Sequence, residues 1–285
     1  MIPRAQLTAW RGQAPWPSDA QVEQDLVISR ALVAMFSNPV VNELVAFRGG
    51  TALHKLFIQP PGRYSEDIDL VQLEAVPIGG LLDTLRSTLD PWLGLPKRKR
   101  GQGRVTLLYR FESTSRPIQR MRLKVEINSR EHFNVLGLEH KRFEVRSRWF
   151  SGAASIVTYA LDELLGTKLR ALYQRKKGRD LFDLWWAARH GEVDPDRVVR
   201  CFCEYLAAGG HRVSRAEFEA NLAHKLQDRS FTAGLSPLLA PGTDWDLAEA
   251  ARWVAAELVA RVPGEPWKNP EGLDARGKTG GTSPS

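Results

Sequence analysis

The chain of 285 residues is 43% hydrophobic and 26% charged, which is typical of a globular protein with a sizeable core and excludes collagen-like, fibrous and wholly disordered classes. No apolar run is long enough for a transmembrane helix, and the first residues do not lead into the apolar segment of a secretory signal. Two cysteines cannot form a disulfide framework. We therefore expect a cytoplasmic protein with no membrane segment.

The net charge of +7 is concentrated in one part of the chain. Residues 97–148 contain 15 Lys or Arg and 5 Glu, a local balance of +10 that leaves −3 for the rest. Such a region attracts polyanions such as nucleic acid, although a solubilising surface would have the same composition.

The pattern of the N-terminal half predicts a mixture of helices and strands. Residues 1–18 are rich in Pro, Trp and Gly and are expected to form an arm. The clearest strand is 120–128, in which apolar and polar residues alternate. The other predicted elements of this half are helices at 19–36, 40–44, 51–57 and 81–89 and strands at 45–47, 65–71, 104–111 and 143–150.

From residue 159 onward the pattern is helical. The predicted helices are 161–173, 180–189, 195–207, 214–225 and 247–262. The last residues, 263–285, hold 4 Pro and 5 Gly with few apolar groups and are expected to be a disordered tail. The sequence thus predicts an α+β protein with an α/β domain at 1–155 and a helical domain at 156–262.

The first candidate motif is Gly49-Gly50-Thr51, which opens a predicted helix. Paired glycines permit a tight turn, and the first turn of a helix presents backbone N–H groups without intrahelical partners. These groups form a natural phosphate cradle, to which Thr51 adds a hydroxyl. The motif is weak alone, because many helices begin after glycines.

Asp67 and Asp69 form the second motif, on the predicted strand 65–71. Because they are two residues apart they point to the same face, while Ile68 and Leu70 point into the core. Adjacent carboxylates repel each other and favour a bound cation, and Mg²⁺ is a hard ion that suits carboxylate and phosphate oxygens. The alternative is a pair of solvated aspartates at the end of a strand.

Glu126 supplies a third candidate carboxylate, on the polar face of 120–128. Three acids could hold two divalent ions, which would clamp the attacking and leaving oxygens of phosphoryl transfer. A cross-strand ion pair between Glu126 and Arg122, Lys124 or another arginine explains this residue equally well.

Lys168 lies in the centre of an apolar stripe on the predicted helix 161–173. Because burying an ammonium without a partner is costly, Lys168 should meet an acid or a bound phosphate, unless it extends past its neighbours into solvent. Asp180 precedes another apolar run, a position in which its ordinary role would be a helix N-cap.

Two short basic runs could bind phosphates. Residues 97–100, Lys-Arg-Lys-Arg, are predicted to lie in a loop between β elements, and residues 175–179 form a basic loop between helices. Each run could contact the backbone of a polyanionic acceptor, and each could equally be a solvated loop.

The segment 48–56, followed by 63–70 with its two aspartates, resembles the AbiEii-type toxin nucleotidyltransferases, which include the MenT toxins of mycobacteria. The stretch 168–184 resembles the C-terminal signature of the same family. The resemblance covers roughly residues 47–186. It implies a polymerase-β-like nucleotidyltransferase core, with a small mixed sheet and flanking helices, followed by a helical half.

The same resemblance implies a Mg²⁺-dependent toxin that moves a nucleoside monophosphate from an NTP to RNA, foremost the tRNA 3′ end, and so blocks translation. The implied partners are this RNA, bound through 97–148 and 175–179, and a cognate antitoxin. The implied site consists of catalytic residues Asp67, Asp69, Lys168 and Asp180, metal ligands Asp67, Asp69 and Glu126, and nucleotide-binding residues Gly49, Gly50, Thr51, Ser65 and Lys55. A nucleotidyltransferase acting on a protein or small-molecule hydroxyl, and a catalytically silent nucleic-acid-binding protein, are the alternatives.

Overall fold

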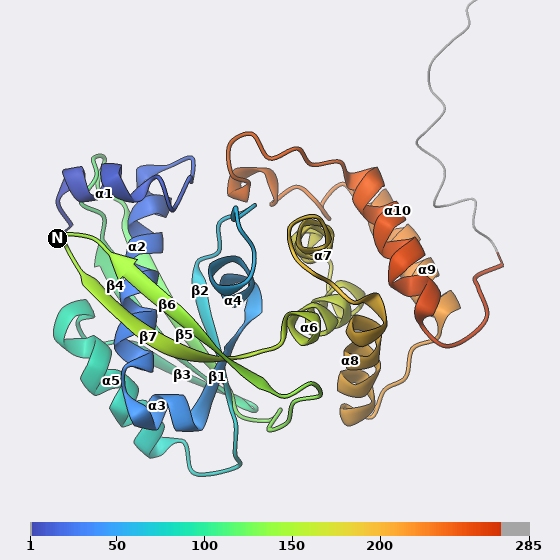
Figure 1. Cartoon of the computed structure of the whole chain (residues 1–285), viewed down its shortest axis with the longest axis horizontal. Coiled ribbons are helices and arrows are strands. Elements are labelled where there is room, and N and C mark those ends of the chain that lie inside the picture. The colour runs from blue at the N-terminus through green and yellow to red at the C-terminus, as the bar shows by residue number, and fades with distance from the viewer. Residues whose placement is uncertain (1, 269–285) are drawn as a thin grey trace, which may run out of the picture. The chain divides into compact units, whose positions relative to one another are not determined.

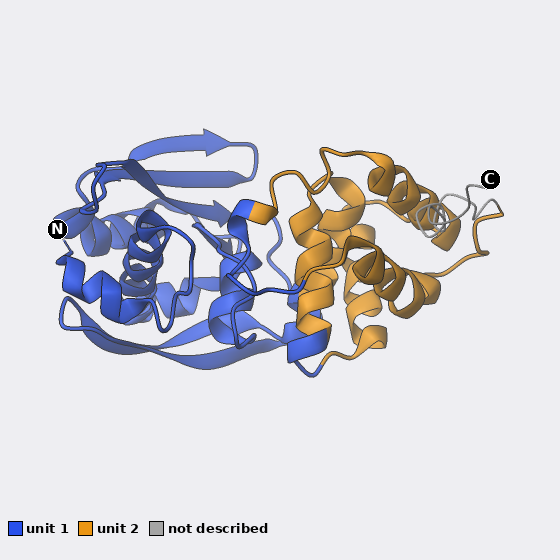
Figure 2. Cartoon of the chain, turned by 90° about the horizontal axis from the view of Figure 1, so that it is seen from above, with its two compact units in different colours: residues 1–164, 189–192, 237–244 blue, residues 165–188, 193–236, 245–285 orange. Residues whose placement is uncertain are grey.

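The computed structural model describes residues 2–268, and these residues confirm the predicted α+β class (Figure 1). The chain divides into two compact units (Figure 2). The first contains residues 1–164, 189–192 and 237–244, and the second contains 165–188, 193–236 and the chain from 245 onward. Among residues 2–268, no helix combines the length and the apolar character that crossing a membrane requires.

A mixed β-sheet organises the first unit. The order of its strands is β3-β4-β5-β2-β1-β7-β6. Strand β2 runs parallel to β5, β1 runs parallel to β7, and the other neighbours are antiparallel. The strands are β1 (Val45–Arg48), β2 (Asp67–Gln72), β3 (Lys97–Gly101), β4 (Arg104–Glu112), β5 (Arg120–Asn128), β6 (Leu138–Arg146) and β7 (Ser151–Tyr159).

Helices of the first unit bury one face of this sheet. The alternating apolar side chains of β4 and β5, such as Leu107 and Val125, are fully buried and share one hydrophobic core with Leu26 of α2 and Leu85 of α5. The polar residues of the same strands therefore lie on the opposite face. The helices are α1 (Arg4–Trp10), α2 (Asp19–Phe36), α3 (Pro39–Leu44), α4 (Gly49–Leu56) and α5 (Gly79–Leu93).

The second unit is helical. Its aromatic core includes Phe182, whose ring lies 5.5 Å from that of Trp186 and 5.3 Å from that of Trp245, centroid to centroid. The remaining elements are α6 (Leu161–Gln174), which begins in the first unit, α7 (Gly178–His190), α8 (Pro195–Ala208), α9 (Arg215–Gln227), η1 (Ser236–Leu238), α10 (Leu247–Glu257) and η2 (Val259–Arg261).

The largest differences between the predicted elements and the structure lie at three places. Residues 1–18 are not a separate arm, because they contain α1 and bury Trp10 and Trp16 in the core. Residues 97–100 are not a loop but belong to the exposed edge strand β3. The single strand predicted at 143–150 is a hairpin of β6 and β7 with its turn at 147–150. Most of the predicted tail at 263–285 lies outside the described residues.

Candidate active site

The three candidate carboxylates of the first unit come together on adjacent strands. Strands β2 and β5 are parallel, in a register that pairs Asp67 with Lys124 and Asp69 with Glu126. Paired residues on neighbouring strands point to the same face, so Asp67, Asp69 and Glu126 share the polar face of the sheet. The adjacency of Glu126 and the aspartate pair, which the sequence left open, is thus a consequence of the β2–β5 register.

Lys124 sits among these acids. Its Nζ lies 2.8 Å from Asp67 Oδ2 and 3.7 Å from Glu126 Oε2. Although partial burial acts to lower the pKa of Lys124, the hydrogen bond with Asp67 and the negative charges around it raise the pKa above its usual value. Within residues 2–268, no three His, Cys, Asp or Glu side chains already surround a common point as a metal site would. The ammonium of Lys124 shows instead that this group of acids accepts a cation.

Asp69 is the most perturbed member of the group. Burial and the neighbouring charge of Asp67 raise the pKa of the Asp69 carboxyl, while the cations Lys124 and Arg48 act in the opposite direction. A carboxylate that is costly to ionise gains from an additional positive charge beside it. The residues therefore fit a divalent, oxygen-seeking ion such as Mg²⁺.

The glycine pair lies directly against this carboxylate. Helix α4 begins at Gly49, two residues earlier than predicted, and Arg48 is its N-cap. Gly49 has φ +86°, and a Cβ there would come within 2.3 Å of Asp69 Oδ2. A side chain at position 49 would thus meet both backbone strain and a clash, so only glycine permits the first turn of α4 to approach Asp69.

A hydroxyl pair and a buried guanidinium join helix α4 to the loop that follows it. Thr51 Oγ1 lies 2.8 Å from Ser65 Oγ and donates to the backbone carbonyl of Asp67 at 2.5 Å. A Cβ at Gly50 would come within 2.5 Å of Nη2 of Arg63, which is 2% exposed. Three predicted nucleotide-binding residues, Gly50, Thr51 and Ser65, are therefore neighbours, and Arg63 adds a cation that the sequence analysis had not assigned.

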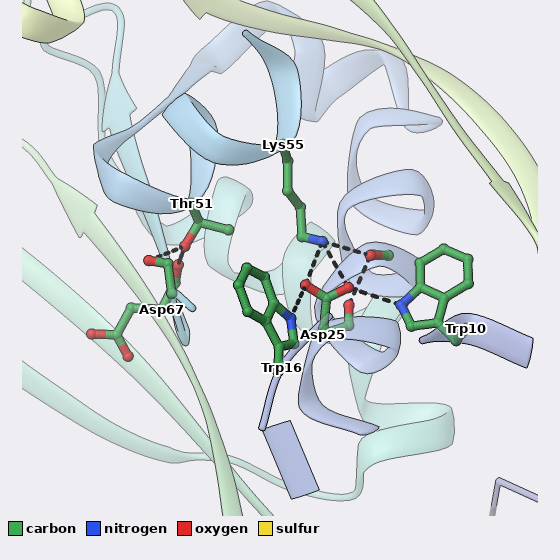
Figure 3. Close-up of polar contacts among 8 residues, drawn as sticks. Trp10, Trp16, Asp25, Thr51, Lys55 and Asp67 are labelled. Atoms are coloured by element: carbon green, nitrogen blue, oxygen red, sulfur yellow. Dashed lines mark hydrogen bonds and ion pairs between the residues drawn. The ribbon is translucent and has the colours of Figure 1, made fainter. Parts of the chain in front are cut away.

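Lys55, predicted to bind nucleotide, is held by an acid (Figure 3). Its Nζ lies 3.0 Å from both carboxylate oxygens of Asp25 and 3.0 Å from Ser29 Oγ. The indoles of Trp10 and Trp16 donate to the same carboxylate at 2.8 and 3.0 Å. One carboxylate thus ties α4, α2 and the N-terminal segment together.

A pocket of about 340 Å³ lies beside this cluster in the first unit. Its lining includes Lys55, Thr51, Ser65 and Arg63, and the two tryptophans close part of its wall. The hydroxyls and cations of the predicted nucleotide-binding motif therefore border a real cavity.

The second unit holds a compact ionic cluster around Lys168. Its Nζ lies 2.8 Å from Asp183 Oδ2 and 3.5 Å from Asp180 Oδ1, and both carboxylates are fully buried. Arg175 binds Asp180 with two hydrogen bonds of 2.7 Å. Lys168 therefore meets acids, one of the partners that its central position in the apolar stripe required.

Asp180 is not the N-cap of its helix. Helix α7 begins at Gly178, so Asp180 is its third residue, and its side chain binds the two cations Lys168 and Arg175. Asp183 was missed by the sequence analysis, although its spacing of three residues from Asp180 places both on one side of a helix. In the basic loop that follows α6, Lys176 is paired with Asp228 at 2.7 Å.

Comparison with known proteins adds an independent line. The family model described as "Nucleotidyl transferase AbiEii toxin, Type IV TA system" matches residues 30–254. A search of curated proteins finds no match. Among solved structures, the chain is similar to MenT4, a nucleotidyltransferase toxin from Mycobacterium tuberculosis, with a TM-score of 0.64 and 18% identity over 92% of this chain and 91% of that one. It is also similar to JHP933 from Helicobacter pylori, with a TM-score of 0.53 and 18% identity over 84% and 90% of the two chains.

Proposed function

Because the chain belongs to the AbiEii nucleotidyltransferase toxin family of type IV toxin–antitoxin systems, we propose that it transfers a nucleoside monophosphate from an NTP to the 3′ end of an RNA, foremost tRNA. The observation that carries this proposal is the position of Gly49 against Asp69, in a sheet register that also aligns Asp69 with Glu126. A phosphate-binding helix start and a group of carboxylates on one sheet face are the parts that phosphoryl transfer needs.

The chain's own residues supply binding and orientation. The first turn of α4, with Gly49, Gly50 and Thr51, would receive the triphosphate, and Ser65 and Lys55 border the same space. Asp67, Asp69 and Glu126 would hold Mg²⁺ in place of the Lys124 ammonium. The ion, when bound, neutralises the charge that develops on the phosphoryl oxygens.

The reaction is an in-line displacement. The hydroxyl oxygen at the RNA 3′ end forms a bond to the α-phosphorus, the bond from this phosphorus to the bridging oxygen breaks, and pyrophosphate leaves while the hydroxyl proton passes to solvent. We include Lys168 and Asp180 of the second unit among the catalytic residues on the basis of the family motif.

The macromolecular partners follow from the charge distribution and the family. A subset of the cations in the basic regions 97–148 and 175–179 would bind the RNA backbone, because cations release counterions from a polyanion. Addition of nucleotides to the tRNA 3′ end would prevent aminoacylation and block translation, and a cognate antitoxin would relieve the block.

Labelled-NTP transfer tests the proposal. The purified protein is incubated with each of the four labelled NTPs and Mg²⁺, together with total RNA, total protein or purified tRNA. Label in the RNA pool, lost when EDTA is added and lost in Asp67→Asn, is the expected result. Label in the protein pool would show that the acceptor is a protein hydroxyl. Label in neither pool would support a catalytically silent nucleic-acid-binding protein.

A further inference from the structure

The edge strand β3 divides its four cations between two faces of the sheet. Strand β3 pairs with β4 in a register that places Lys97 opposite Leu108 and Lys99 opposite Thr106. The intervening Arg98 lies opposite Leu107, whose side chain is buried under the helices. The two lysines therefore lie on the polar face, and Arg98 and Arg100 lie on the helix-covered face.

The register continues from Lys99 to the carboxylates. Thr106 on β4 is opposite Glu126 on β5, and Glu126 is opposite Asp69 on β2. Lys99, Thr106, Glu126 and Asp69 thus form one row across four strands. Because neighbouring strands are about 4.8 Å apart, three spacings separate Lys99 from Asp69 by about 14 Å. A second row joins Lys97 through Leu108 and Lys124 to Asp67.

Further exposed arginines lie on the same polar face. Arg104 is diagonal to Glu126 at 3.9 Å, and Arg110 is directly opposite Arg122. Leu108, half-buried, is the one apolar side chain that β3, β4 and β5 present on this face. A protein partner needs an apolar centre in its interface, whereas a polyanion needs spaced cations, so this surface suits a nucleic-acid backbone.

We propose that the polar face of β3–β5, lined by Lys97, Lys99, Arg104, Arg110 and Arg122, binds the phosphates next to the 3′ end of a single-stranded RNA. The proposal rests on the proposed function for the identity of the acceptor. It assigns the path of the RNA to one face, so that Arg98 and Arg100 of the same strand take no part. When the 3′ hydroxyl lies at the carboxylates, the phosphates that precede it in the RNA lie over the two rows that end at Lys97 and Lys99.

The two faces of β3 provide a matched pair of variants. Lys97→Gln with Lys99→Gln and Arg98→Gln with Arg100→Gln remove the same charge from alternate positions of one exposed strand. Binding of a fluorescent single-stranded RNA is measured from 50 to 200 mM KCl, in EDTA and without NTP. Affinity falls as salt rises, and each lost phosphate contact makes the slope of log affinity against log salt less steep by about 0.7. The lysine-pair variant should therefore have a slope that is less steep by about 1.4, and it should bind RNA at least tenfold more weakly near 100 mM salt. The arginine-pair variant should keep the slope and the affinity of the wild type.

Equal effects of the two pairs, or a larger effect of the arginine pair, would overturn the proposal. Melting temperatures equal to that of the wild type show that each variant is folded. The binding assay contains no NTP or Mg²⁺, so it separates this proposal from the proposed function. If the lysine pair weakens RNA binding and the arginine pair does not, but no nucleotide transfer is found, only the proposed function is refuted.

Discussion

Lys124 balances the charge of the three acids in the first unit. It contacts Asp67 and Glu126, and with Arg48 it opposes the rise in the pKa of Asp69. The ammonium of Lys124 thus lies between the carboxylates, where a bound cation would lie. A metal ion bound by these acids would have to compete with an ammonium that the chain itself provides.

Lys124→Met should make the protein depend on an external cation. Without the ammonium the acids repel one another, so the melting temperature in EDTA should fall. Addition of Mg²⁺ should then raise it by more than in the wild type, because the ion no longer displaces a bound cation. Arg122→Met, on the same strand, is the control. An equal Mg²⁺-induced rise in the wild type and both variants would show that Lys124 and the ion do not compete.

Asp67→Asn and Asp69→Asn should each abolish transfer and leave the fold intact. Removing one carboxylate relieves repulsion within the group, so the melting temperature should hold or rise slightly, whereas the ion loses a ligand. Glu66→Gln is a matched control, because Glu66 is the exposed neighbour of Asp67. Transfer near the wild-type rate by either asparagine variant would contradict the assignment of the metal site.

Asp25→Asn should destabilise the first unit strongly. Asp25 is 6% exposed and Lys55 13% exposed, and loss of one partner of a buried ion pair costs about 3–5 kcal/mol. Two indole N–H groups also lose an acceptor. Asp19 lies on the same helix as Asp25 and forms a half-exposed pair with Arg11. Asp19→Asn, which breaks this pair, should cost less than about 1 kcal/mol.

Urea unfolding of the two variants measures this difference. Adding Lys55→Met to Asp25→Asn should recover part of the loss, because the unpaired ammonium is removed with it. Equal stability of the two single variants would mean that the carboxylate of Asp25 does not hold this cluster together.

At the scale of elements, alternation predicted strands well only where one face is apolar. Strand β5 alternates apolar and polar residues and was predicted with its observed bounds. Strand β3 has no apolar residue because it is an exposed edge, so its cations were assigned to a loop. The small residues that begin β7, Ser-Gly-Ala-Ala-Ser, carry little β-propensity, and the strand follows from pairing with β6 and β1.

The candidate site was predictable to the extent that it is local in sequence. The glycines of α4 and the aspartates of β2 form short motifs, whose meaning follows from helix and strand geometry. The partners of these motifs are set by tertiary structure: Lys124 by the β2–β5 register, and Asp25 by the packing of α2 on α4, 30 residues from Lys55. Sequence spacing carries no sign of such pairs.

Helix α9 ends with a buried cation that should give stability a defined pH dependence. Lys225 is 5% exposed and donates to the carbonyls of Leu172 and Tyr173 in the last turn of α6. Burial, with Lys176 assisting and Asp180 opposing, lowers the pKa of Lys225 from 10.5 to about 8. The charged form is therefore disfavoured in the folded state, and the penalty is fully present below pH 8.

As the pH rises from about 8 to 10.5 the folded protein is already neutral at Lys225 while the unfolded chain still binds the proton, so this residue's contribution should increase stability. Lys225→Met should lack this increase. The free energy of unfolding of both proteins, measured at pH 7, 8, 9 and 10, gives the difference, in which all other titrations cancel. If the free energies of unfolding of the two proteins change with pH in parallel, the lowered pKa of Lys225 is contradicted.

At the scale of the whole molecule, the first unit is not a continuous piece of chain. Residues 237–244 return to it after most of the second unit. Tyr64 N–H donates to the carbonyl of Leu238 at 2.7 Å, and Ala240 N–H donates to that of Gly62 at 3.0 Å. The late segment thus holds the loop that carries Arg63 and Ser65 to helix α4.

A chain cut after residue 164 should accordingly retain the sheet but lose order in the loop 59–66. Amide hydrogen exchange in this loop should become faster than in the full chain, because the returning segment no longer accepts and donates its backbone hydrogen bonds. Joining residues 237–244 to the cut chain through a flexible linker should restore protection, whereas the same linker with a Gly/Ser segment of equal length should not. Unchanged protection in the cut chain would mean that the loop is held by the first 164 residues alone, and that the return of the chain has no part in shaping the candidate nucleotide site.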